Sequence, residues 1–124
     1  MKMTIALVAL GSALGGVMRY LVTLALAGAK GFPWATLSVN VVGSFLIGLF
    51  SGLIAKQWGG TTTGEMVRCF AVVGICGGFT TFSTFSNETF RLLQANAWLS
   101  ATLYVTVSIF AGLLAVFLGY LISK

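Results

Sequence analysis

The side chains of this sequence that could take part in chemistry are mostly hydroxyls, aromatic rings and amides. The densest group is the run Phe79-Thr80-Thr81-Phe82-Ser83-Thr84-Phe85-Ser86, which includes the hydroxyls of Ser83 and Thr84. Phe82 and Phe85 are three residues apart, so both rings would lie on one face of a helix. Hydroxyls donate hydrogen bonds and ring edges carry partial positive charge, which suits contact with an anion. Packing against lipid or a protein core would explain a lone pair of rings equally well.

More polar residues occur in apolar parts of the sequence. Asn40 belongs to a stripe of small and polar residues at spacings of three and four, along which another helix could pack closely. Its amide would either clamp that helix or donate hydrogen bonds to an anion. Tyr104 and Ser108 are one helical turn apart and add two hydroxyls. Glu88 is the acid of this apolar setting, and Arg91, three residues further on, could pair with it.

Arg19 is a charged residue inside an apolar segment. On a helix it would lie about 22 Å from the start of the segment and about 8 Å short of the far membrane boundary. Its side chain could snorkel to that boundary, or it could raise the local electrostatic potential for anions.

The residue inventory excludes two broad classes of function. The sequence lacks His and has no Cys beside a base, so acid–base and nucleophilic catalysis are not expected and the chain is not predicted to be an enzyme. The net charge of +5 comes from seven Lys and Arg against two Asp and Glu. These cations do not cluster into a basic patch, so a nucleic-acid partner is not expected either.

The elements that position these residues follow from composition. Of the 124 residues, 58% are hydrophobic and only 7% are charged, whereas a soluble domain carries about a quarter charged residues. We therefore expect an all-α integral membrane protein. At roughly 20 residues per crossing, the chain has room for four helices and no second domain. The apolar runs place these helices in a single transmembrane domain, residues 1–124, at about 4–27, 34–55, 65–93 and 97–123.

The third segment is unusual because glycines lie near its middle. Gly74, Gly77 and Gly78 precede the hydroxyl-rich run, and both features weaken a continuous helix. One interpretation is close packing against another helix through small residues. The other is a helix broken near its middle, whose freed carbonyls and amides coordinate something inside the membrane.

The distribution of positive charge bears on orientation. Four crossings would divide the cations into Lys2, Lys56, Arg68 and Lys124 on one side, and Lys30, Arg91 and a snorkelling Arg19 on the other. A count of four against three gives the positive-inside rule almost no preference. The chain is therefore predicted to insert both ways and to form an antiparallel dimer, with a weakly biased single topology as the alternative. Four helices also leave little room for a lumen within one copy.

Together these features favour a passage for a small anion. A pore that removes water from an anion must replace it with positioned donors, and a full positive charge would hold the ion too tightly. Hydroxyls, an amide and ring edges meet both demands.

The stretch Gly77-Gly78-Phe79-Thr80-Thr81-Phe82-Ser83-Thr84-Phe85-Ser86-Asn87-Glu88 resembles the hallmark motif of the Fluc (CrcB) family of fluoride channels. Gly15-Gly16 with Arg19, and Trp34 through Asn40 to Gly43, resemble further parts of the family pattern, so the resemblance covers the whole chain. It implies an antiparallel, dual-topology homodimer with two pores. Such a protein is a multi-pass protein of the bacterial plasma (inner) membrane, in contact with the lipid bilayer, and it exports fluoride passively from the cytoplasm.

The resemblance also implies roles for individual residues. A structural Na⁺ at the dimer interface would be held by the backbone carbonyls of Gly77 and Thr80. The fluoride pathway would comprise Asn40, Phe82, Phe85, Ser83, Thr84, Tyr104 and Ser108. Arg19 and Glu88 match motif residues whose roles are less defined, and the family's next hydroxyl position is Gly112 here.

Two other functions remain as alternatives. A small multidrug or cation exporter also has four helices and dual topology, but it needs a carboxylate in its first helix, where this chain has Arg19. A non-transporting assembly subunit would use the polar stripes for packing alone.

Overall fold

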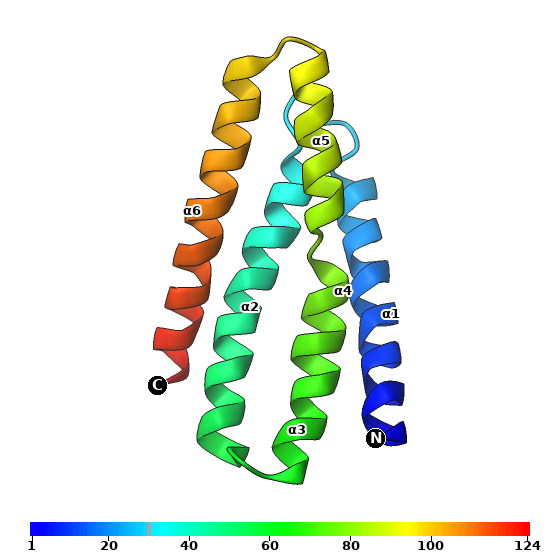
Figure 1. The fold of residues 1–124 in the computed structure, drawn as a ribbon, viewed down its shortest axis with the longest axis vertical. Helices are drawn as coiled ribbons and strands as arrows, with labels where there is room; N and C mark the ends of the chain where they lie inside the picture. The colour runs from blue at the N-terminus through cyan, green and yellow to red at the C-terminus, as the bar shows by residue number, and fades with distance from the viewer. Residues whose placement is uncertain (30) are drawn as a thin grey trace.

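The computed structural model describes residues 1–29 and 31–124, and these residues form helices joined by short turns (Figure 1). Lys30, one of the cations in the orientation count, lies outside the described residues. The elements are α1 (Lys2–Ala25), α2 (Trp34–Trp58), α3 (Thr62–Arg68), η1 (Cys69–Cys76), α4 (Gly77–Phe79), α5 (Phe82–Gln94) and α6 (Trp98–Ser123). Helices α1, α2 and α6, together with the span Thr62–Gln94, are long and apolar enough to cross a membrane. The all-helical prediction with four spans is confirmed.

The helix ends differ from the predicted ones by a few residues. α1 ends at Ala25 rather than Ala27, and α2 continues to Trp58 rather than ending at residue 55. The extension arises because Lys56 and Gln57 are good helix formers whose long side chains can reach water from the last turn. The third span begins at Thr62, since the Thr61 hydroxyl accepts a hydrogen bond from the Gly64 N–H at 3.0 Å and caps the helix there.

The helices pack in two groups through backbone contacts at glycines. α2 packs along α6, where a Cβ on Gly48 would collide with the Val116 carbonyl and one on Gly119 with the Phe45 carbonyl. α1 packs along η1 and α4, where a Cβ on Gly15 would collide with the Ile75 carbonyl. Small residues allow helix axes to approach this closely in membranes, so the glycines fix which helices are neighbours.

The third span is interrupted near its middle. α4 ends at Phe79, and α5 begins at Phe82. Between them Thr80 (φ −86°, ψ 158°) and Thr81 (φ −153°, ψ 118°) are extended. Figure 1 shows the break as a short stretch of coil between α4 and α5. Both interpretations of the glycine-rich segment hold: the helix is broken, and Gly74 and Gly78 pack closely against Gly11 and Ser12 of α1.

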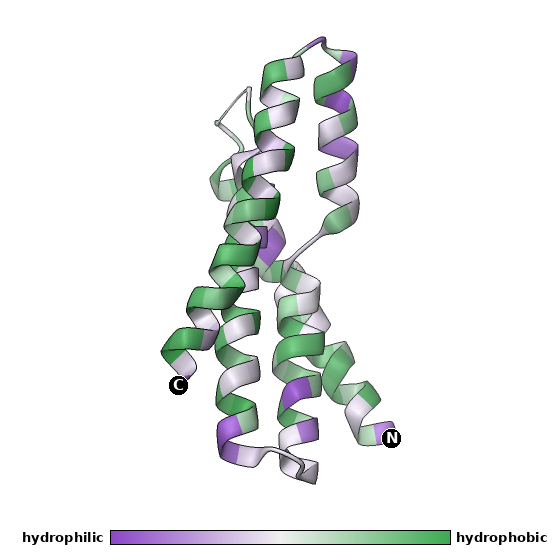
Figure 2. Cartoon of the chain, turned by 60° about the vertical axis from the view of Figure 1, so that its left-hand side comes forward, coloured by the Kyte–Doolittle hydropathy of each residue, from purple (hydrophilic) through white to green (hydrophobic). Residues whose placement is uncertain are grey.

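Side-chain polarity varies along the molecule. Figure 2 shows hydrophobic residues over most of α1, α2 and α6, with hydrophilic residues at the end of α2, in α3 and along α5. α5 buries none of its side chains in a single copy of the chain. Its polar face is therefore uncovered, although it belongs to a membrane-length span.

Candidate functional site at the helix break

The amide of Asn40 holds the broken part of the third span. Its Oδ1 accepts a hydrogen bond from the Thr81 N–H at 2.8 Å, and its Nδ2 donates to the Thr81 carbonyl at 3.1 Å. α2 places Asn40 beside the break, and the extended backbone of Thr81 presents both groups to the same side chain. The predicted clamp role of Asn40 is therefore seen in the structure, and its target is backbone.

Two of the carbonyls around the break accept hydrogen bonds from side chains of other helices. The Gly78 carbonyl accepts from Arg19 Nε at 3.0 Å, and the Thr81 carbonyl accepts from Asn40. In a continuous helix the carbonyls of Gly77 and Thr80 would bond the N–H groups of Thr81 and Thr84.

Those two N–H groups are engaged elsewhere in this structure. The Thr81 N–H donates to Asn40 Oδ1, and the Thr84 N–H donates to Thr81 Oγ1 at 3.2 Å. The carbonyls of Gly77 and Thr80 therefore lose their helical donors.

Oxygen atoms of this kind suit a hard cation, which prefers carbonyl and carboxylate ligands. Among residues 1–29 and 31–124, no three His, Cys, Asp or Glu side chains come together as a metal site. A cation at the break would thus depend on backbone oxygens such as those of Gly77 and Thr80. Both are positioned by the same two-residue interruption, so the donor set fits such an ion.

A pocket of about 180 Å³ lies next to the break. It is lined by Asn40, Phe82, Phe85, Ser108 and Ile109, which come from α2, α5 and α6. Of the described residues, Ser108 is the one whose side-chain oxygen is buried without a hydrogen-bond partner. The structure therefore gathers four residues that the sequence had placed in an anion pathway, and one of them has an unused hydroxyl.

The two phenylalanine rings lie on the same side of α5, as their spacing predicted. Their centroids are 5.9 Å apart at an interplanar angle of 45°, and Phe85 also packs against Tyr104 at 5.0 Å. Phe82 is 79% exposed in the single copy, whereas the Tyr104 side chain is fully buried. Core packing within one copy thus explains the position of Phe85 and leaves that of Phe82 unexplained.

Ser83 and Thr84 form a hydroxyl cluster with Thr81 at the start of α5. Thr81 Oγ1 lies 3.2 Å from Thr84 Oγ1 and 3.4 Å from Ser83 Oγ. Sequence reasoning did not single out Thr81, which caps α5 and bonds Asn40. The sequence signal was present, because Thr is one of the residues preferred at a helix N-cap.

Glu88 lies farther along α5 and is bonded to α6. Its Oε1 accepts a hydrogen bond from the Tyr104 hydroxyl at 2.9 Å. The ion pair with Arg91 that the spacing suggested is not formed among the described residues, because the carboxylate turns toward Tyr104. Glu88 and Arg91 instead line a second pocket, of about 290 Å³, together with Gly31, Phe32, Pro33 and Leu92.

Gly112 lies at the α6 position where the family resemblance would place a further hydroxyl. This residue faces α2. A Cβ at Gly112 would lie 3.6 Å from the hydroxyl oxygen of Ser44. Ser44 belongs to the same polar stripe of α2 as Asn40, four residues away. A hydroxyl from α2 is therefore present at the position where α6 has none.

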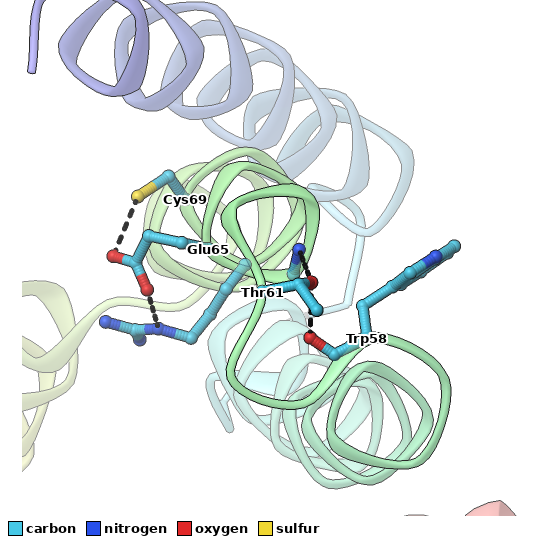
Figure 3. Close-up of polar contacts among 6 residues, drawn as sticks. Trp58, Thr61, Glu65 and Cys69 are labelled. Carbon is cyan, nitrogen blue, oxygen red and sulfur yellow. Dashed lines mark hydrogen bonds and ion pairs between the residues drawn. The ribbon is translucent and has the colours of Figure 1, made fainter.

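A separate group of polar contacts lies between the end of α2 and the start of η1 (Figure 3). Thr61 Oγ1 donates to the Trp58 carbonyl at 2.6 Å, and Glu65 pairs with Arg68 at 3.7 Å. The Cys69 thiol lies 3.7 Å from the same carboxylate. These contacts cap and stabilise the start of the third span, and they are far along it from the break.

The fold and this site define a class of protein: an integral membrane protein of four helical spans, with a largely apolar pocket that contains one amide and one hydroxyl at a break in the third. A family model described as "CrcB-like protein, Camphor Resistance (CrcB)" matches residues 6–120. The chain therefore belongs to the CrcB-like family, which confirms the family resemblance of residues 77–88.

Curated relatives match almost the whole chain. A protein of Flavobacterium psychrophilum is 46% identical over 98% of this chain and 97% of its own length. One of Paramagnetospirillum magneticum is 51% identical over 95% and 93%, and one of Thermus thermophilus is 51% identical over 92% and 88%. All three are named "Fluoride-specific ion channel FluC". These names describe an ion channel and not an enzyme.

Proposed function

We propose that this chain is a fluoride channel that lets fluoride leave the cytoplasm passively across the bacterial inner membrane. Two copies inserted in opposite orientations would form an antiparallel homodimer with two pores. The relatives' names and the pocket at the break support the choice of ion and of mechanism.

The observation that carries the proposal is the unpartnered Ser108 hydroxyl beside Asn40, Phe82 and Phe85. A buried hydroxyl without a partner costs free energy, so it is retained where something binds it. The pocket offers a hydroxyl donor and ring edges with partial positive charge, and it has no cationic side chain in its lining. A small dehydrated anion would be stabilised there and could still leave.

The uncovered face of α5 supports the dimer. Polar side chains along it are exposed in a single copy, namely those of Ser83, Ser86, Asn87, Arg91 and Gln94. Lipid tails offer no hydrogen bonds, so such a face is stable inside a membrane only against protein or a water-filled vestibule. A second copy placed against the break would supply both, and it would also cover the exposed ring of Phe82.

A structural Na⁺ fits the same arrangement. The carbonyls of Gly77 and Thr80 lack their helical donors, and two copies meeting at the break would offer twice that number of oxygens. When bound, the ion would hold the two copies together and offset the partial negative charge of the carbonyls. Asn40 and Arg19 would keep the neighbouring carbonyls out of this set.

The alternatives have less support. A proton-coupled multidrug exporter would need a carboxylate in α1, and α1 contains none. A purely structural subunit would give the Ser108 hydroxyl and its pocket no role.

Ion flux from liposomes tests the proposal. Purified protein is reconstituted into liposomes loaded with potassium fluoride or potassium chloride, and efflux is followed with ion-selective electrodes after valinomycin is added. We expect fluoride efflux and no chloride efflux. Equal flux of both halides would contradict the selectivity, and silence toward both would favour the structural subunit.

A further inference from the structure

Arg19 reaches the break from α1, and its position assigns it a role that the family resemblance left open. We propose that Arg19 is a positioning residue whose Nε–H fixes the Gly78 carbonyl and thereby sets the cation affinity of the neighbouring Gly77 and Thr80 carbonyls. The inference rests on the proposed function, because it assumes that those carbonyls hold a cation.

Arg19 is brought to the break by a backbone contact between α1 and the third span. A Cβ on Gly15 would collide with the Ile75 carbonyl and would lie 2.8 Å from the Phe79 nitrogen. A Cβ on Gly78 would lie 2.6 Å from the Ser12 carbonyl. Arg19 follows Gly15 by about one helical turn, so its side chain starts at the level of the break. Snorkelling to the membrane boundary is therefore not what the side chain does here, since Nε donates to Gly78 at 3.0 Å.

The hydrogen bonds around the break engage some of its carbonyls and leave others without a donor. Arg19 occupies the Gly78 carbonyl from α1, and Asn40 occupies the Thr81 carbonyl from α2. The carbonyls of Gly77 and Thr80 have lost their helical donors and accept none of these side-chain bonds, and each lies beside an occupied carbonyl. Without the Arg19 bond, the α4 side of the break would be held by no side chain from another span among these bonds. The Gly77 carbonyl, one residue away, would then be free to reorient.

Arg19 could affect cation affinity through its charge or through its hydrogen bond, and the two effects predict opposite changes when Arg19 is replaced by a neutral residue. A guanidinium near the site repels a second cation, so removal of its charge alone would strengthen cation binding. Loss of the Nε donor would instead weaken binding by loosening the carbonyls. Gln separates the two effects, because its Nε2 is attached at the same point of the side chain as Arg Nε. Arg19→Gln thus keeps a donor without charge, whereas Arg19→Met keeps neither.

The test measures the thermal stability of the purified full-length protein as sodium chloride replaces N-methylglucamine chloride at constant ionic strength. We expect a sodium-dependent rise in Tm, with a half-point that shifts upward about tenfold in Arg19→Met, as loss of one charge-assisted hydrogen bond would produce. In Arg19→Gln the sodium concentration at the half-point should stay within about twofold of its value in the protein without the substitution. Fluoride efflux is recorded in parallel.

Each other result overturns the inference. Equal half-points in the Gln and Met variants would contradict the donor role, and half-points that fall equally in both would make charge the cause. A lower Tm at every sodium concentration with an unchanged half-point would make the role merely structural. Absence of any sodium effect in the unchanged protein would remove the cation site from the proposed function as well. Fluoride efflux in the unchanged protein separates these cases, because it would leave the channel intact while the Arg19 role fails.

A second pair of variants tests the same inference without touching Arg19. Gly15→Ala should push α1 away from the break. It should therefore raise the sodium concentration at the half-point about as much as Arg19→Met does. Gly16→Ala is the matched control, since a Cβ there meets nothing within 4 Å and the half-point should not change. Equal behaviour of these two variants would contradict the placement of Arg19 by the Gly15 contact.

Discussion

Asn40 and Thr81 are 41 residues apart in sequence and exchange two hydrogen bonds, at 2.8 and 3.1 Å, between one amide and one extended backbone unit. Through this pair α2 holds the place where the third span stops being helical. The same amide lines the pocket that contains the Ser108 hydroxyl. Asn40 therefore contributes both to the group of backbone carbonyls at the break and to the pocket.

Asn40→Leu should disable both sites. The substitution keeps the approximate volume but removes both bonds to Thr81, so we expect a loss of about 1–3 kcal/mol in stability and at least about a tenfold loss of fluoride efflux. Thermal unfolding and electrode recordings measure the two effects. Val42→Ala, at a 48% exposed position of the same helix, serves as the control and should change neither quantity appreciably. Normal efflux in Asn40→Leu would remove the amide from the pathway.

Ser108→Ala should move stability and flux in opposite directions. Removal of an unpartnered buried hydroxyl relieves its desolvation cost, so the free energy of unfolding should be unchanged or higher by about 1 kcal/mol. Fluoride efflux should fall about tenfold, because a donor to the anion is lost.

Ser123→Ala is the comparison for Ser108, since the Ser123 hydroxyl donates to the Tyr120 carbonyl at 2.6 Å. It should lower stability and leave efflux unchanged. If both variants lost stability and kept their efflux, Ser108 would have an ordinary packing role.

Phe82→Ile and Phe85→Ile should each reduce fluoride efflux while the protein still assembles. An aliphatic side chain lacks the partial positive edge that an aromatic ring presents to an anion. Because Phe82 is 79% exposed in one copy, its replacement should leave the stability of the single chain within about 0.5 kcal/mol. Phe110→Ile, at a 67% exposed position of α6, is the control for a change at an exposed ring that does not line the pocket. Full efflux in both test variants would exclude the rings from the pathway.

Tyr104 and Glu88 should be energetically coupled. A double-mutant cycle with Tyr104→Phe and Glu88→Ala, scored by chemical or thermal unfolding, should give a coupling energy of about 1–2 kcal/mol. Arg91→Gln paired with Glu88→Ala should give about zero, since the carboxylate turns toward Tyr104. A larger coupling with Arg91 than with Tyr104 would contradict the observed hydrogen bond.

Opposite insertion of the two copies can be examined by crosslinking. Cysteines introduced on α5 at Ser86 should crosslink between copies whose termini face opposite sides, as judged by a tag accessible from only one side of the membrane. The exposed polar face of α5 is the reason to choose this position. Crosslinks confined to copies of the same orientation would contradict the antiparallel arrangement.

Local sequence features predicted much of the fold. Apolar runs located the four spans because each spans the membrane by its own length and composition. The glycines and the β-branched run that begins at Thr80 made a break one of two interpretations, since both weaken a helix within a few residues. The capping role of Thr81 was visible in the same way but was not recognised.

Contacts between distant residues could not be predicted in this way. The bond from Arg19 to Gly78 depends on how closely α1 packs, and that distance is set by glycines on two spans. The Glu88 carboxylate bonds to Tyr104 rather than to Arg91, because α6 brings the buried Tyr104 hydroxyl within hydrogen-bond distance of it. The π-helical geometry of Cys69–Cys76 is a further feature without a sequence signal that we can name.

The two extended threonines between α4 and α5 have an electrical consequence that no side chain provides. Peptide dipoles add along a helix to roughly half a positive charge at its start and half a negative charge at its end. A helix that ends at Phe79 and another that starts at Phe82 therefore place opposite poles side by side in the middle of the span. The negative pole consists of the free carbonyls at the end of α4, and the positive pole consists of the N–H groups at the start of α5, where Phe82 lies. In the proposed channel, one interruption of two residues would thus favour a cation on one side of the break and an anion on the other.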